Sequence, residues 1–150
     1  MKLAEALQER ADLSARIAQL KIRLANNAVM QEGVEPAEDP EALMEEMDRC
    51  YENLENLTAR INLTNSRVKV EGETLTVLLA RRDCLKDKIS ALRAFRDSAS
   101  ELGERFTKTE IRRLSTVNVR ELQRRIDKLS ASYRTLDNAI QAANWNASLK

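Results

Sequence analysis

The sequence predicts a mainly all-α protein, an antiparallel four-helix bundle of long, coiled-coil-like helices with short β segments in the connections. Along four stretches, apolar residues recur at intervals of three and four, as one face of a helix requires. Only 3 Gly and 2 Pro occur in 150 residues, so few sharp turns can divide the chain. Charged residues make up 33% of the chain and aromatic residues 3%, a composition typical of coiled coils with an aliphatic core. We expect one helical-bundle domain over residues 1–150, because this length fits a single core.

The first two helices are predicted at about residues 2–29 and 40–66, each with a narrow apolar stripe that steps as a heptad does. The stripe of the first helix is Leu3, Ala6, Arg10, Leu13, Ile17, Leu20 and Leu24. The stripe of the second is Leu43, Met47, Cys50, Leu54, Leu57, Ile61 and Thr64. Asp39 followed by Pro40 is a helix-start signal, because Asp caps a helix and Pro fits its first turn.

The third and fourth helices are predicted at about residues 74–102 and 119–143. Thr74 and Asn118 are the expected caps, and the third helix should end near Gly103. The third stripe is Leu75, Leu78, Arg82, Leu85, Ile89 and Leu92, with Leu79 and Phe95 widening it. The fourth is Leu122, Ile126, Leu129, Tyr133, Leu136, Ile140 and Ala143. Helices of such similar length favour side-by-side packing.

Two connections have the alternating, β-branched pattern of short strands, at residues 67–70 and 110–117. We therefore expect small β elements at the ends of the bundle.

Composition also limits the function. The net charge is +1, so there is no overall field to attract nucleic acid or a membrane surface. No uncharged run approaches the roughly 20 residues that span a bilayer, and the first residues lack a secretory signal, so we expect a cytoplasmic protein. There is no His, which removes the commonest general base and metal ligand, and no catalytic motif is present. We expect no enzyme and no cofactor, and reduced, structural roles for Cys50 and Cys84.

Two oppositely charged segments are candidate interaction sites. Residues 31–46 hold seven acidic residues and no basic one, which indicates a solvated connection, with metal binding or partner binding as alternatives. The candidate anion contacts, in the basic segment 105–113, are Arg105, Lys108, Arg112 and Arg113. Mutual neutralisation of the two segments, within one chain or between subunits, is our first interpretation, and contact with nucleic-acid phosphates is the alternative.

Polar residues within the helices form a second candidate site. Arg10 and Arg82 occupy stripe positions, where a desolvated guanidinium needs a carboxylate partner. They are expected to set the helix register, or else to lie at an oligomer interface or line a polar pocket. Residues 62–66, Asn-Leu-Thr-Asn-Ser, are expected to cap the second helix, with ligand binding as the alternative.

Five stretches carry a resemblance to a known family. They are Leu3–Leu7 with Glu9–Leu13, Gln31–Pro40, Arg60–Ser66, Thr74–Thr76 leading to Arg82–Asp83, and Asn144–Trp145. On these stretches the chain resembles the septicolysin-like family of small uncharacterised bacterial proteins, over nearly its whole length. The resemblance implies a buried or inter-subunit polar network formed by Arg10, Arg60, Asn62, Thr64, Asn65, Arg82 and Asp83. Val77 departs from the pattern, because an acidic residue is expected there.

Three functional hypotheses follow. The first is a self-associating structural or protein-interaction module, a homo-oligomer or an adaptor for a protein partner, since narrow stripes on long helices leave surface for further helices. The second is a binder of nucleic acid or an anionic ligand through residues 105–113. The third is a carboxylate-metal enzyme of the ferritin-like kind, whose Glu-x-x-His motif cannot be completed here. Charged flanks beside narrow stripes favour protein partners over insertion into a membrane.

Overall fold

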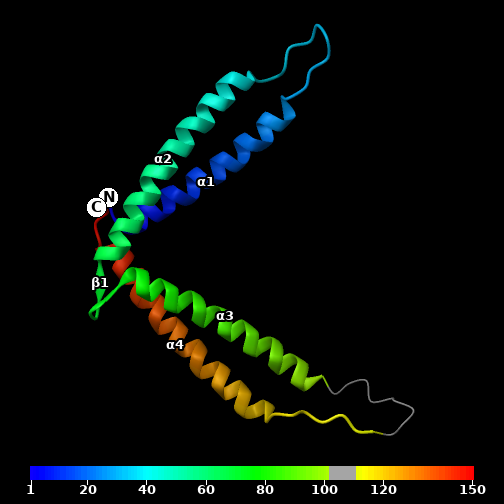
Figure 1. The fold of residues 1–150 in the computed structure, drawn as a ribbon, viewed down its shortest axis with the longest axis vertical. Coiled ribbons are helices and arrows are strands. Elements are labelled where there is room, and N and C mark those ends of the chain that lie inside the picture. The colour runs from blue at the N-terminus through cyan, green and yellow to red at the C-terminus, as the bar shows by residue number, and fades with distance from the viewer. Residues whose placement is uncertain (102–110) are drawn as a thin grey trace. The chain divides into compact units, whose positions relative to one another are not determined.

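The computed structural model of the protein describes residues 1–101 and 111–150. Four long helices dominate it: α1 (Leu3–Asn26), α2 (Pro40–Arg67), α3 (Leu75–Ser100) and α4 (Val119–Asn146). Two short strands, β1 (Lys69–Val70) and β2 (Glu73–Thr74), connect α2 to α3 (Figure 1). The mainly all-α fold class is thereby confirmed, and it is consistent with a helical bundle.

The chain divides into two compact units, which are described here one at a time. The first consists of residues 1–69 and 142–150, and it contains α1 and α2. The second consists of residues 70–141, and it contains α3 and most of α4. The assignment of the whole chain to one domain stays a prediction.

The helices begin where the sequence indicates. The carboxylate of Asp39 accepts the amide N–H of Glu41 at 3.1 Å, with Pro40 in the first turn of α2. The Thr74 hydroxyl accepts the Val77 N–H at 3.4 Å, and the Asn118 side chain accepts the Glu121 N–H at 3.1 Å. These bonds satisfy amides that have no partner within the first turn of a helix.

The first unit is an antiparallel hairpin of α1 and α2. Arg16 pairs with Glu46 and Arg23 with Glu38, so residue numbers rise along one helix as they fall along the other. A core cluster lies between the helices, formed by Ile17, Leu20, Leu43 and Cys50, with Leu13, Leu24, Met47 and Leu54 packed against it. Every member belongs to a predicted stripe.

The second unit pairs α3 with α4, also antiparallel. Arg82 bonds to Asp137 and Arg96 bonds to Gln123, which fixes the register of the two helices. The core cluster is formed by Ile89, Leu122 and Ile126, with Leu85, Leu92, Val117, Leu129 and Tyr133 packed against it. Phe95 was expected to widen the third stripe, but 44% of its surface is exposed, because the core between two helices is one narrow stripe wide.

Of the two predicted β segments, the one at residues 67–70 is confirmed. Residues 67–70 contribute β1, which pairs with β2 within the chain across a tight turn at Glu71 and Gly72. Both turn residues have positive φ, 51° and 88°, and glycine adopts this conformation without strain. The strand predicted at 110–117 is wrong for the described residues 111–117, which contain none. There the Ser115 hydroxyl bonds both the Val117 carbonyl and its N–H, closing a local turn before Asn118 caps α4.

Helix ends differ from the predicted bounds by a few residues. The first helix was expected to reach residue 29, but α1 stops at Asn26 because the Asn27 side chain donates to the Arg23 carbonyl at 2.8 Å. The same side chain accepts the Glu38 N–H at 3.0 Å, which ties the end of α1 to the segment before α2. Within α3 the last helical residue is Ser100, and Gly103 lies outside the described residues.

Candidate functional site

One predicted polar cluster forms inside the first unit. Thr64 is fully buried in the α2 stripe, and its hydroxyl donates to the Arg60 carbonyl at 2.8 Å. The same oxygen accepts the Lys150 N–H at 3.0 Å, while Arg60 Nε donates to the main-chain oxygen of Lys150 at 3.0 Å. Two of the seven network residues therefore hold one segment, residues 147–150, against α2.

The same segment also joins the beginning of the chain. Lys2 and Ser148 form an antiparallel bridge, flanked by hydrogen bonds from Leu3 N–H to the Ala147 carbonyl at 2.9 Å and from Leu149 N–H to the Met1 carbonyl at 3.0 Å. The two ends of the chain are therefore held together by main-chain bonds within this unit. This cluster serves to hold the structure together.

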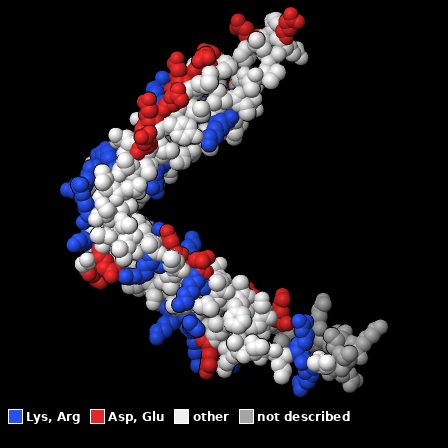
Figure 2. Space-filling view, in the orientation of Figure 1, with Lys and Arg blue, Asp and Glu red and all other residues white. Residues whose placement is uncertain are grey.

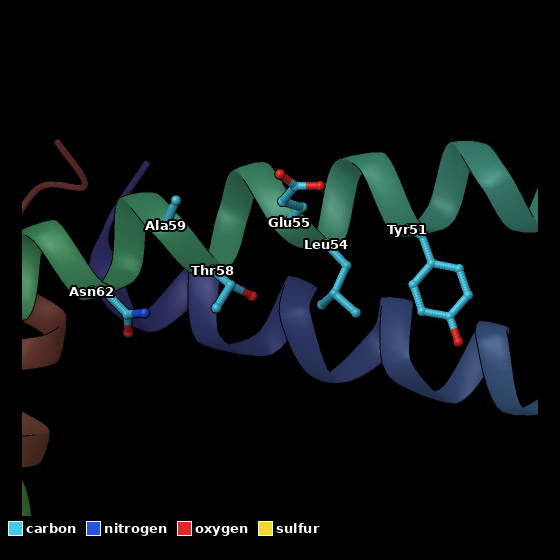
Figure 3. A pocket seen from close by; sticks show the side chains of 6 residues that line it. All are labelled: Tyr51, Leu54, Glu55, Thr58, Ala59 and Asn62. Carbon is cyan, nitrogen blue, oxygen red and sulfur yellow. The ribbon is translucent and has the colours of Figure 1, made fainter.

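Three further network residues lie in the first unit without joining this cluster. Arg10 and Asn65 are half-buried, and Asn62 is exposed. Asn62 lies at one end of a shallow groove of about 450 Å³ along α2. In Figure 3 the side chains of Tyr51, Leu54, Thr58 and Asn62 project to one side of α2, and Glu55 and Ala59 to the other. The groove is open and is lined by a single helix, so it provides little to recognise a small ligand.

The remaining two network residues, Arg82 and Asp83, lie in the second unit. Arg82 Nη1 bonds to the Asp137 carboxylate on α4 at 3.1 Å, and its Nε bonds to Asp83 at 3.3 Å. Arg82 is 24% exposed and Asp137 32%, so this pair is partly desolvated. This is the carboxylate partner that a guanidinium in a stripe requires, and it sets the register of α3 against α4.

The acidic segment 31–46 takes basic partners from its own hairpin. Arg16 Nη2 bonds to Glu46 at 2.6 Å, and Arg23 Nε bonds to both oxygens of Glu38 at 3.1 Å. The hydrogen bond from Arg23 lowers the pKa of the Glu38 carboxyl below its ordinary value, and bonding to Glu46 raises the pKa of Arg16. Glu38 and Glu46 are therefore paired with arginines of α1. Neutralisation of the acidic segment by residues 105–113 stays a prediction.

Exposed apolar side chains gather where α1 passes into α2, and we call this set the hairpin tip. Its members are Ile22, Val29, Met30, Val34 and Met44, whose exposed fractions are 62%, 87%, 64%, 56% and 38%. Figure 2 shows acidic side chains beside uncharged surface at this end of the hairpin. Periodicity did not reveal the tip, because three of its residues lie in the connection. A signal that could have found it was the unbroken Ala28-Val29-Met30 run at the end of the first predicted helix.

Residues 111–114, Ile-Arg-Arg-Leu, form a second exposed stretch with apolar side chains, which we call the 111–114 segment. Ile111 is 70% exposed and Leu114 76%, and the two arginines between them are exposed as well. The segment thus combines apolar and basic side chains on one short stretch. The other two predicted anion contacts, Arg105 and Lys108, lie outside the described residues.

The described residues contain no group of three acidic or cysteine side chains placed to hold a metal ion. Cys50 is buried in the first core cluster and Cys84 is exposed on α3, and both are free thiols. That the protein is no enzyme and holds no cofactor stays a prediction. None of the helices in residues 1–101 and 111–150 combines the length and apolar character of a membrane span.

The fold and these surfaces define an all-α protein built from helical hairpins. Residues 10–149 match a family of unknown function (DUF6847), and the chain belongs to this family. The chain is also similar to a solved structure described as a functionally unknown conserved protein from Corynebacterium diphtheriae. The two are 34% identical, with a TM-score of 0.94 over 100% of this chain and 99% of the other. No curated protein matches the chain. The resemblance to the septicolysin-like family stays a prediction.

Proposed function

We propose that the protein is a self-associating structural or protein-interaction module of the bacterial cytoplasm. In this proposal the hairpin tip of one copy binds the 111–114 segment of another copy. The observation that carries it is the set of five large apolar side chains exposed at the hairpin tip.

Exposed apolar side chains are unremarkable singly, but a group of them at one end of a hairpin is typical of a protein contact surface. Two of the five, Met30 and Met44, are methionines, whose flexible side chains adapt to a partner. The core of the first unit does not draw on these residues. Burial against another molecule would remove these exposed side chains from water.

Charge favours a second copy of the chain as that partner. The connection at the tip carries Glu32 and Glu35, both exposed, and the 111–114 segment carries Arg112 and Arg113, also exposed. Both surfaces present apolar side chains beside their charges, so contact would bury apolar area and pair opposite charges together. Two tips facing each other would instead bring like charges together.

This contact joins two different surfaces, so it is heterologous rather than two-fold symmetric. Heterologous contacts build closed rings or open chains, according to the rotation between successive copies. A module of this kind would act as a building block or scaffold. The free thiols of Cys50 and Cys84 suit a reducing compartment, and the similar protein from Corynebacterium diphtheriae suits a bacterial setting.

Sedimentation velocity over a range of micromolar concentrations tests the proposal. The native chain should associate, and association should weaken at high salt because the paired charges are exposed. The double variant Arg112→Glu/Arg113→Glu should be monomeric, and mixing it with Glu32→Lys/Glu35→Lys chains should restore association. Arg124→Glu, a charge reversal at an exposed position on α4 outside the 111–114 segment, should associate as the native chain does. A native chain that stays monomeric at every concentration would refute the proposal.

Nucleic-acid binding is the second candidate, and the exposure of Arg112 and Arg113 favours it. Two results would support nucleic-acid binding. The native chain should shift a nucleic acid in a gel at low salt, and the Arg112→Glu/Arg113→Glu chain should not. Adding Glu32→Lys/Glu35→Lys chains should not restore the shift to that variant. Absence of any shift at low salt would remove it.

A further inference from the structure

The second unit has a groove of about 370 Å³ between α3 and α4, lined by no residue of the 111–114 segment. Its lining includes three basic side chains, Lys86 and Arg93 from α3 and Arg134 from α4. Among the described residues no Asp or Glu lines it. The groove therefore has a local positive charge in a protein whose net charge is close to zero.

Helix geometry places these side chains together. Lys86 and Arg93 are seven residues apart, so they lie on one face of α3 two turns from each other. Arg134 faces them from α4. In the described part of the chain none of the three forms an ion pair, whereas Arg82 and Arg96 on the same α3 helix are held by Asp137 and Gln123.

Three hydroxyl-bearing side chains also line the groove: Ser90, Ser130 and Tyr133. The Ser130 hydroxyl oxygen is buried and has no hydrogen-bond partner among the described residues. Other hydroxyls on α4 bond the carbonyl four residues earlier, Ser132 and Thr135 both at 3.2 Å. Ser130 does not, so its donor and acceptor capacity is left for something else, and a buried polar group normally has a partner.

We propose that this groove binds a small ligand bearing a phosphate group. Guanidinium groups grip phosphate oxygens with paired hydrogen bonds, and a lysine adds a point charge that any phosphate oxygen accepts. The hydroxyls of Ser90 and Tyr133 supply further donors, as a multiply charged oxyanion requires. The Ser130 oxygen is buried in its present rotamer, and it supplies another donor once it turns toward the groove. The volume falls within the roughly 300–1,000 Å³ of small-molecule sites, which fits a phosphorylated metabolite better than a polymer.

The sequence did not reveal this site because its residues come from two helices. Lys86 and Arg93 each directly follow a stripe residue of α3. Many charged residues that only face solvent have the same spacing, so this pattern does not mark a site. Only the register set by the pair of Arg82 and Asp137 brings Arg134 opposite them. The site is independent of self-association, since none of its lining residues belongs to the hairpin tip or the 111–114 segment.

The test is a ¹⁵N NMR titration with inorganic phosphate and inorganic pyrophosphate, against sodium chloride at matched ionic strength. The phosphate probes should shift the amides of Ser90, Ser130 and Tyr133 saturably, and pyrophosphate should bind more tightly. Arg134→Gln should weaken binding by roughly tenfold, the value of one charge-assisted bond. Arg125→Gln, an exposed change on another face of α4, is the matched control and should bind as the native chain does.

Ser130→Ala separates binding from folding, because alanine suits a helix and the lost hydroxyl has no partner. The urea concentration at which this variant unfolds should equal or exceed that of the native chain. Its affinity for pyrophosphate should nevertheless be several-fold weaker. Equal affinity in the native chain, Ser130→Ala and Arg134→Gln would overturn the proposal. So would equal shifts with chloride at the same ionic strength.

Discussion

Replacing Thr64 by valine tests the cluster that holds residues 147–150 against α2. Thr64→Val keeps the shape of the side chain and removes its hydroxyl. The Lys150 N–H loses its acceptor at 3.0 Å, and the hydroxyl no longer donates to the Arg60 carbonyl at 2.8 Å. The lost bond to the Arg60 carbonyl costs less, because this carbonyl still accepts a main-chain N–H within the helix.

The magnitude follows from the burial of Thr64, which is 0% exposed. A typical hydrogen bond contributes about 1 kcal/mol net. The amide that loses its acceptor belongs to Lys150, an exposed residue, so water can replace part of the lost bond. The added methyl group offsets some of the loss as well, so we expect the free energy of unfolding to fall by about 0.5–1 kcal/mol. The Lys150 amide should also exchange with solvent faster.

Urea unfolding followed by circular dichroism gives the first quantity, and hydrogen exchange gives the second. Thr58→Val is the control, since Thr58 is half-buried on the same helix and its hydroxyl bonds to nothing in the described part of the chain. If the two variants unfold alike and the Lys150 amide exchanges at its native rate, this cluster does not hold the segment.

Three further predictions concern the helix pairs. Ile126→Ala should lower the free energy of unfolding by about 2–5 kcal/mol in urea melts, because Ile126 is 1% exposed in the second core cluster, whereas Ile111→Ala should change it by less than about 0.5 kcal/mol. Asn118→Ala removes the cap of α4 and should cost about 1 kcal/mol, visible as an earlier melt; no change would mean that water replaces the cap. The hydrogen bond from Arg23 lowers the pKa of Glu38 in the folded protein. The stability that this bond contributes is therefore fully present above the ordinary glutamate pKa, and it is lost as the pH falls through the pKa of Glu38 in the folded protein. Glu38→Gln should therefore reduce the acid sensitivity of unfolding, and identical pH profiles would contradict this.

The sequence predicted the helices well because their signals are local. Asp39, Thr74 and Asn118 each cap a helix within three residues of themselves. The stripes hold for the same reason, since a repeat of three and four defines one face of a helix whatever lies against it. Ile17 and Leu20 on α1 are buried as expected.

The sequence alone could not predict contacts between residues that lie far apart along the chain. Thr64 was recognised as a polar stripe residue, but its partner Lys150 is 86 positions away. The groove residues Lys86 and Arg134 meet only through the register of α3 on α4. The hairpin tip was missed for another reason: helical periodicity says nothing about a connection, so the exposure of Val29 appears only in three dimensions.

Disulfide trapping between differently marked copies tests self-association most directly. In a Cys84→Ser background, Val34→Cys chains mixed with Leu114→Cys chains should form a mixed disulfide under mild oxidation, since both positions are exposed and Cys50 is buried. The mixed product should exceed the product of either chain alone, and it should decline at high salt. Random pairing of the two chains, or no cross-link at all, would contradict a contact between the hairpin tip and the 111–114 segment.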